Sequence, residues 1–268
     1  MKRLFLVTVI LLPFFYSCEK ELVYEDYQSS TLLRQVRGTE GDMEVMTYYN
    51  TGNIFEHVQR FSYRKFLYNK KGQLIKIEIA LSLNPLSCAI IPGTDFEAGD
   101  DPRKAKIGQY ITYDYTDNGN IKIKKSYYIN DEHEQLMNYS KYEYINDKVI
   151  KINIFNPKDQ LTHYYTYLYD GSGNVSEEEY FYMQEGTDAR LQTRILYEYD
   201  DKNNPYKVFS VEGTPGTYTN LNNIIKQTTI YYYTEGEQTD IIENTYEYND
   251  SGYPVKVNDL EYIYGAEE

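Results

Sequence analysis

The chain has 268 residues, a formal net charge of −14 and 33 tyrosines, against 10 phenylalanines and no tryptophan. Because the charge is strongly negative and the lysines are interspersed with acids, the composition argues against a nucleic-acid partner and against electrostatic attachment to anionic lipid. A tyrosine can pack its ring while its hydroxyl meets water, so this excess predicts sheets whose two faces are both partly solvated.

Residues 1–17 have the composition of a secretory signal peptide. Met1-Lys2-Arg3 is basic, and the apolar run from Leu4 to Phe15 is shorter than the ~20 residues that span a bilayer. Phe15-Tyr16-Ser17-Cys18 resembles a bacterial lipobox, which implies that the thiol of Cys18 carries lipid. Residues 18–42 are then the lipidated cysteine and its tether. We therefore expect a membrane-attached lipoprotein of the cell envelope, in the outer membrane of a Gram-negative bacterium, on the periplasmic or the surface face.

Residues 43–268 are organised by a short unit, which is clearest from Tyr113 to Ile123. Tyr113 and Tyr115 alternate with a polar residue, so both rings fall on one face of a strand. Asp117-Asn118-Gly119-Asn120 supplies turn residues, and alternation resumes at Ile121. The unit therefore predicts a β-hairpin.

Copies of this unit recur along the chain. They run from Phe66 to Lys76, Tyr113 to Lys122, Tyr142 to Lys151, Tyr167 to Ser176, Tyr197 to Lys207 and Tyr246 to Lys256, with a weaker copy at Tyr48–Ile54. Gly72, Gly119, Gly173 and Gly252 are expected to take positive φ, as is Asn203, whereas the copy with Lys148 should turn differently.

The acids between paired tyrosines predict cross-strand partners on the returning strands. The expected pairs are Asp114–Lys122, Glu143–Lys151, Glu198–Lys207 and Glu247–Lys256. Each pair should help to define the register of its hairpin.

Two copies carry a family resemblance. Tyr169-Asp170-Gly171-Ser172-Gly173-Asn174-Val175 and Tyr199-Asp200-Asp201-Lys202-Asn203-Asn204 resemble the YD repeat of the Rhs family. The whole chain is similar to small YD-repeat lipoproteins of unknown function in Gram-negative bacteria. The resemblance implies an array of hairpins and names no activity.

The predicted fold is all-β: an antiparallel meander of YD-like hairpins in a single domain, residues 43–268, forming an extended twisted sheet or a partly rolled barrel. Residues 205–212 and 224–233 are among the expected strands, and little or no helix is expected. Residues 84–107 and 213–223 are insertions. The first contains Cys88, whose apolar setting favours a buried thiol, with intermolecular pairing as the alternative.

Motifs for catalysis and cofactors are not found. His57, His133 and His163 are far apart, and there is no His-Glu-x-x-His or Cys-x-x-Cys to bind zinc. Asp95, Asp100 and Asp101 lack the ligand order of a calcium loop. We predict no enzymatic activity, no metal and no cofactor.

Tyrosine clusters are the candidate ligand contacts, because adjacent tyrosines point to opposite faces and leave rings exposed. They are Tyr127, Tyr128, Tyr164, Tyr165, Tyr180, Tyr182, Tyr231, Tyr232 and Tyr233. We expect a non-enzymatic protein that binds or scaffolds through a tyrosine-rich face, with a glycan or an envelope protein as its partner. The alternatives are a glycan-active enzyme with paired carboxylates and a structural module of an envelope or secretion assembly.

Overall fold

The computed structural model describes residues 27–39, 41–59, 62–81, 103, 105–130, 133–183, 188–216 and 218–265. The signal peptide, Cys18, Cys88 and most of the 84–107 insertion lie outside these residues. The described chain confirms the all-β prediction, since its strands form one antiparallel sheet. None of its helices is long and apolar enough to cross a membrane.

Within the described residues, seventeen strands form the sheet, and the 3₁₀ helix η2 lies between β12 and β13 in the chain. The elements are β1 (Leu33–Gly38), β2 (Gly41–Tyr48), β3 (Ile54–Gln59), β4 (Ser62–Tyr68), β5 (Leu74–Leu81), β6 (Gln109–Tyr115), β7 (Ile121–Asn130), β8 (His133–Ile145), β9 (Lys148–Phe155), β10 (Leu161–Tyr169), β11 (Val175–Tyr182), β12 (Arg190–Tyr199), η2 (Pro205–Glu212), β13 (Ile224–Tyr233), β14 (Gly236–Glu243), β15 (Tyr246–Tyr248), β16 (Pro254–Val257) and β17 (Leu260–Tyr264).

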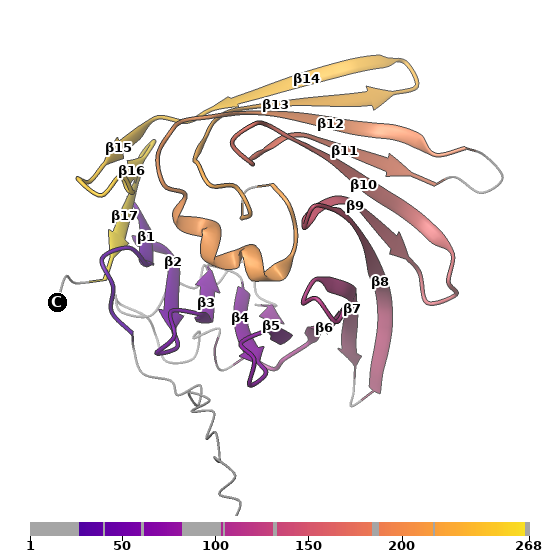
Figure 1. Cartoon of the computed structure of the whole chain (residues 1–268), viewed down its shortest axis with the longest axis horizontal. Helices are drawn as coiled ribbons and strands as arrows, with labels where there is room; N and C mark the ends of the chain where they lie inside the picture. The colour runs from indigo at the N-terminus through magenta and orange to yellow at the C-terminus, as the bar shows by residue number, and fades with distance from the viewer. Residues whose placement is uncertain are drawn as a thin grey trace, which may run out of the picture.

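The sheet is a meander that curls into a wide arc (Figure 1). Each strand from β1 to β14 pairs with the next, β15 to β17 do the same, and β17 returns to pair with β1. The sheet is not closed. Figure 1 shows η2 inside the arc, so the sheet has a concave face toward η2 and a convex face away from it.

The repeat turns share one set of hydrogen bonds. The side chain of Asp170 accepts from the backbone N–H groups of Ser172 and Asn174, both at 2.9 Å. Asn69, Asn156 and Asn249 accept in the same way from residues two and four positions on. The predicted glycines take positive φ. A short polar side chain that bonds the following backbone therefore closes each of these hairpins.

The copy with Lys148 turns differently, as predicted. Its two turn residues, Asn146 and Asp147, have φ of 50° and 61°, which is the signature of a two-residue hairpin turn. Ile145 faces Lys148 directly.

The acid–lysine predictions are correct in two hairpins. Glu143 faces Lys151, and Glu247 faces Lys256 with an ion pair of 3.5 Å. Asp114 instead faces Ile123, because a bulge shifts the register, and its carboxylate pairs with Lys125 at 3.3 Å.

The fourth expected pair is wrong because residues 205–212 are not a strand. Glu198 faces Lys226 of β13, with an ion pair of 3.2 Å. Asn204 caps η2 by accepting from the N–H of Tyr206, Pro205 starts the helix, and Gly213 ends it at φ 68°. Asn203 is not among the residues with positive φ, since the chain leaves the repeat turn there.

Residues 203–222 are therefore an insertion within a repeat turn, and we call them the plug (residue 217 is not described). Asp200 accepts from Lys202 N–H at 2.9 Å and from Asn223 N–H at 3.0 Å. These bonds match those of Asp170, with Asn223 in the place of Asn174. The return strand is supplied by β13 after the plug.

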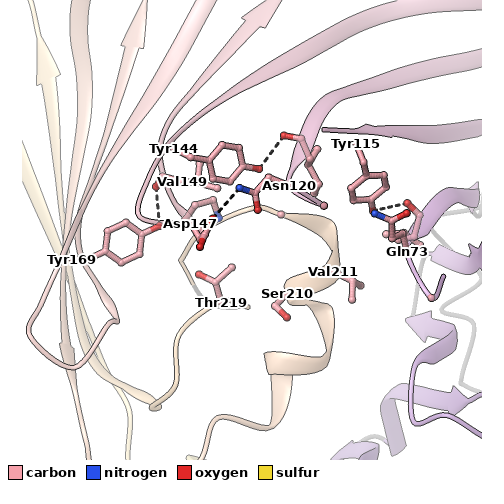
Figure 2. Close-up of a pocket in the computed structure, with 16 residues that line it drawn as sticks. Gln73, Tyr115, Asn120, Tyr144, Asp147, Val149, Tyr169, Ser210, Val211 and Thr219 are labelled. Carbon is pink, nitrogen blue, oxygen red and sulfur yellow. Dashed lines mark hydrogen bonds between the residues drawn. The ribbon is translucent and has the colours of Figure 1, made fainter. Parts of the chain in front are cut away.

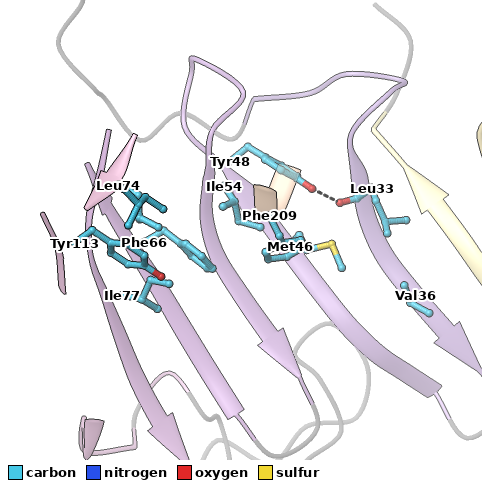
Figure 3. Close-up of a cluster of buried hydrophobic side chains, with 11 residues drawn as sticks. Leu33, Val36, Met46, Tyr48, Ile54, Phe66, Leu74, Ile77, Tyr113 and Phe209 are labelled. Carbon is cyan, nitrogen blue, oxygen red and sulfur yellow. Dashed lines mark hydrogen bonds between the residues drawn. The ribbon is translucent and has the colours of Figure 1, made fainter. Parts of the chain in front are cut away.

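The main core lies between the plug and the N-terminal strands (Figure 3). Phe209 of η2 is fully buried, with its ring 4.8 Å from that of His57 and 5.9 Å from that of Phe66. Met46 and Ile77 pack into the same cluster. Phe209 thus fills the space between η2 and the concave face of the N-terminal strands.

Candidate binding pocket at the turn rim

The second tyrosine of successive repeats links each hairpin to the one before it. The hydroxyl of Tyr115 donates to Leu74 C=O at 2.7 Å, that of Tyr144 to Ile121 C=O at 3.0 Å, and that of Tyr169 to Val149 C=O at 2.8 Å. Each acceptor lies at the start of a returning strand, next to the repeat turn. The rings therefore follow one another along the edge where the turns lie, which we call the turn rim.

Burial in this row keeps the hydroxyls protonated. It raises the pKa of Tyr115, Tyr144 and Tyr169 to about 12. All three hydroxyls thus remain hydrogen-bond donors at neutral pH.

The plug is attached to the sheet in its middle and near its C-terminal end. Near η2's C-terminus, Glu212 accepts a short charge-assisted hydrogen bond from Arg64 of β4, and both side chains are largely buried. Past the helix, the Asn220 side chain accepts from Val175 N–H at 2.9 Å, and Asn174 accepts from Leu221 N–H at 2.8 Å. Asn174 and Asn220 are each 1% exposed, so these bonds are shielded from water.

A pocket of about 340 Å³ lies between the turn rim and the plug (Figure 2). The tyrosines of the rim lie on one side, and Ser210 and Val211 of η2 lie on the other. The lining residues are Gly72, Gln73, Leu74, Tyr115, Gly119, Asn120, Ile121, Tyr144, Asp147, Val149, Tyr169, Ser210, Val211, Gly213, Pro215 and Thr219.

Gly213 allows the plug to approach the rim this closely. A Cβ on Gly213 would overlap Cδ1 of Ile121, and its φ of 68° disfavours any other residue. Asn120 and Asp147, from neighbouring hairpins, are joined by a 3.2 Å hydrogen bond from the Asn120 amide. The pocket wall is therefore built from fixed contacts before any ligand binds.

The lining combines flat rings with neutral polar groups. Gln73, Asn120, Ser210 and Thr219 contribute amides and hydroxyls, and Asp147 is the one acid. The oxygen Oγ1 of Thr219 is buried without a hydrogen-bond partner. Among the described residues, no lysine or arginine lines the pocket, and the nearby Lys148 ammonium lies over the Tyr169 ring, 4.7 Å from its centroid. The lining therefore offers rings, amides and hydroxyls in the main, which suits a neutral ligand rich in hydroxyl groups.

A partly buried carboxyl lies where the plug meets β11. Glu178 accepts from the hydroxyl of Tyr197 at 3.4 Å, and a Cβ on Gly216 of the plug would lie 3.5 Å from its Oε2. Burial raises the pKa of Glu178 to about 7, and the Tyr197 bond offsets part of that rise. Glu178 does not line the rim pocket, where Asp147 is the acid among the described residues.

The predicted tyrosine clusters lie elsewhere on the sheet, and none of the nine lines the rim pocket. On the convex face, Tyr127 stacks on Tyr110 with centroids 4.6 Å apart, and Tyr164 stacks on Phe181 at 4.7 Å. Tyr232 is also on this face, because its position alternates with those of its neighbours.

The other six predicted tyrosines lie on the concave face. The ring centroids of Tyr165 and Tyr180 are 5.1 Å apart, and those of Tyr231 and Tyr233 are 6.3 Å apart. Tyr128, Tyr182 and Tyr233 are the exposed ones, at 43%, 48% and 57%. The sequence pattern predicts ligand contacts at tyrosines outside the repeat core. The tyrosines that line the pocket are instead the second tyrosines of the repeats.

The histidines do not form a metal site. His57 contacts Glu44 at 2.8 Å and is buried beside Phe209. Within the part of the chain that the structure describes, no group of three or more His, Cys, Asp or Glu side chains is placed to hold a metal ion.

Comparisons with known proteins bear on the fold. No protein-family model and no curated protein matches the chain. A porin-like protein from Bacteroides vulgatus matches with a TM-score of 0.52 at 13% identity, over 87% of this chain and 99% of that one. A porin-like protein from Bacteroides uniformis gives a TM-score of 0.38 at 14% identity, over 88% and 99%. A DUF3836 family protein from Parabacteroides distasonis gives 0.22 at 16% identity, over 51% and 92%. The first match shows that this chain shares its all-β fold with a porin-like protein from Bacteroides vulgatus.

Proposed function

We propose that this chain is a lipid-anchored, non-enzymatic protein of the cell envelope that binds a neutral glycan in the rim pocket. The observation that carries the proposal is the lining that the described residues form: three tyrosine rings, several amides and hydroxyls, one carboxylate and no lysine or arginine.

Each part of that lining matches a part of a sugar. The C–H face of a sugar ring packs on an aromatic face, as the rings of Tyr115 and Tyr144 would allow. Sugar hydroxyls both donate and accept, so they can pair with the exposed Asn120–Asp147 couple. The pocket volume of about 340 Å³ lies at the lower end of the range for small-ligand sites, which favours one or two sugar units.

The cellular location is supported by the N-terminal sequence. The basic residues, the short apolar run and the lipobox-like segment before Cys18 are features of exported bacterial lipoproteins. A porin-like structural neighbour is compatible with an envelope protein. Metabolic labelling with a fatty-acid analogue tests the anchor: Cys18→Ser should lose the label, and retention of the label would contradict lipidation.

Glycan binding is tested on an array of neutral and acidic oligosaccharides, followed by calorimetry on the best neutral binder. Ser210→Leu should fill the pocket and weaken binding by about tenfold or more, or ~1.4 kcal/mol. Lys207→Leu introduces the same residue on the exposed side of η2, away from the rim pocket, and is the control. An array with no neutral binder, or equal losses in the two variants, would contradict the proposal.

A further inference from the structure

Strand β14 is an open edge of the sheet. Among the described residues, its register runs along β13 without a shift, from Lys226↔Glu243 to Tyr233↔Gly236. All eight of its residues are exposed, including Ile241 at 58% and Ile242 at 54%. Two large apolar side chains thus face solvent on opposite sides of one strand.

The hairpin geometry defines which backbone groups of β14 face outward. Thr234 and Glu235 form a two-residue turn, and at the far end Asn244 N–H donates to Ile225 C=O at 2.9 Å. Hydrogen-bonded and non-hydrogen-bonded pairs alternate along an antiparallel ladder. The even-numbered residues 236–244 therefore bond to β13, and the N–H and C=O groups of Glu237, Thr239, Ile241 and Glu243 point away from it.

This edge lacks most of the usual protection. Natural edge strands are protected by charged side chains, above all lysine, or by proline, a bulge or a covering segment. Residues 236–243 contain no lysine and no proline, and their register with β13 has no bulge. Such a strand can accept an extended segment of another chain by adding it to the sheet.

The acidic residues of β14 indicate what charge a partner segment should carry. Glu237, Asp240 and Glu243 lie within the eight residues, and no basic residue balances them inside the strand. A second copy pairing antiparallel about Asp240 would place Asp240 opposite Asp240 and Glu237 opposite Glu243, between chains that each carry −14. Like charges therefore disfavour a second copy, and lysine or arginine residues would pair with the acids.

We infer that β14 is a docking edge for an extended, basic segment of a protein partner, which joins the sheet by backbone hydrogen bonds beside Thr239 and Ile241. Apolar residues of the segment cover Ile242 on one face of β14. Its basic residues face Glu237 and Glu243 on the other, with their aliphatic stems over Ile241. This site is separate from the rim pocket and does not depend on glycan binding.

The test uses the folded chain and a short synthetic peptide of alternating lysine and valine, with alternating glutamate and valine as the control peptide. The basic peptide should bind, and hydrogen exchange should slow at the amides of Glu237, Thr239 and Ile241. Thr239→Pro removes one outward N–H without touching the ladder to β13, and should weaken binding by about tenfold. Thr239→Ala keeps that N–H, and its affinity for the basic peptide should stay within about twofold of the wild-type affinity.

Charge reversal provides an independent check. Glu237→Lys combined with Glu243→Lys should transfer the preference to the glutamate–valine peptide. Circular dichroism confirms that each variant keeps its fold. The inference is overturned if the basic peptide binds without slowing exchange in β14, if Thr239→Pro and Thr239→Ala bind alike, or if the free chain is a dimer with β14 already protected.

Discussion

The turns at Asp170 and Asp200 are made by the same hydrogen bonds but carry very different lengths of chain. At Asp170 the turn closes directly onto Asn174, whereas at Asp200 the plug is inserted before Asn223 takes the equivalent position. The repeat turn tolerates the insertion because its bonds involve only the first and last residues of the loop. The repeat thus determines strand pairing, while the inserted segment adds Phe209 to the main core and forms one wall of the pocket.

The largest expected effect comes from weakening the plug. Phe209→Ala removes a fully buried ring at the centre of the concave face, and should lower the free energy of unfolding by about 3–5 kcal/mol. Urea denaturation measures it. Leu196→Ala, at a site 37% exposed on a repeat strand, is the control and should cost about 1 kcal/mol or less. Similar losses in the two variants would show that the plug is a dispensable addition to the sheet.

The next largest effect is on how the free energy of unfolding depends on pH, and it arises where the plug contacts β11. The pKa of Glu178 is raised to about 7, so the folded chain favours its protonated form. Its contribution to stability is complete below pH ~4.5 and is lost as the pH rises to about 7. At pH 8, Glu178→Gln should be more stable than the wild type by on the order of 3 kcal/mol, with little difference at pH 4.

Thermal unfolding across this pH range measures the effect, with Glu177→Gln on the opposite face as the control. Glu177 pairs with Arg194 on the convex face at 3.1 Å, away from the plug. Parallel pH profiles for the wild type and Glu178→Gln would show that the plug contact leaves this carboxyl solvated.

A smaller difference is expected between the turns at Asp170 and Asp200, in what each aspartate contributes to the free energy of unfolding. Asp170→Ala removes acceptors from Ser172 and Asn174, and should cost about 1–2 kcal/mol. Asp200→Ala also leaves the Tyr248 hydroxyl unpaired, and should cost about 2–3 kcal/mol. Chemical denaturation of both variants provides the comparison. A larger loss at Asp170 would contradict the view that Asp200 holds the insertion in register.

The smallest effect belongs to the surface charges of a regular hairpin. Glu247 and Lys256 face each other at 3.5 Å and are 70% and 46% exposed, so Glu247→Gln should cost a few tenths of a kcal/mol. High salt should abolish even that difference. A loss above about 1 kcal/mol would mean that such pairs stabilise the fold as well as fixing its register.

Much of the repeat architecture is predictable from the sequence. Turn residues such as Asp170 and Gly173 act through local backbone bonds, so their pattern can be read without knowledge of distant parts of the chain. The strand prediction for residues 205–212 is wrong because their valine, tyrosine and phenylalanine favour strands. The helix signals are nevertheless present, with Asn204 and Pro205 at the start and Gly213 at the end.

The pocket cannot be predicted in this way. It joins Gly72, Asn120 and Thr219, which are distant in the sequence and meet only because the sheet curls around the plug. The positions of its tyrosines are predictable, but their role depends on the wall opposite them. Local patterns do not contain that information.

The most direct test of the account is to map a neutral oligosaccharide onto the chain by amide chemical-shift perturbation. Titration should shift the amides of Asn120, Asp147, Ser210 and Thr219 together, with one saturating affinity. Tyr128, Tyr182 and Tyr233, the exposed tyrosines away from the pocket, should remain unperturbed. Shifts confined to those three tyrosines, with the pocket amides unchanged, would contradict a glycan site between the repeat turns and the plug.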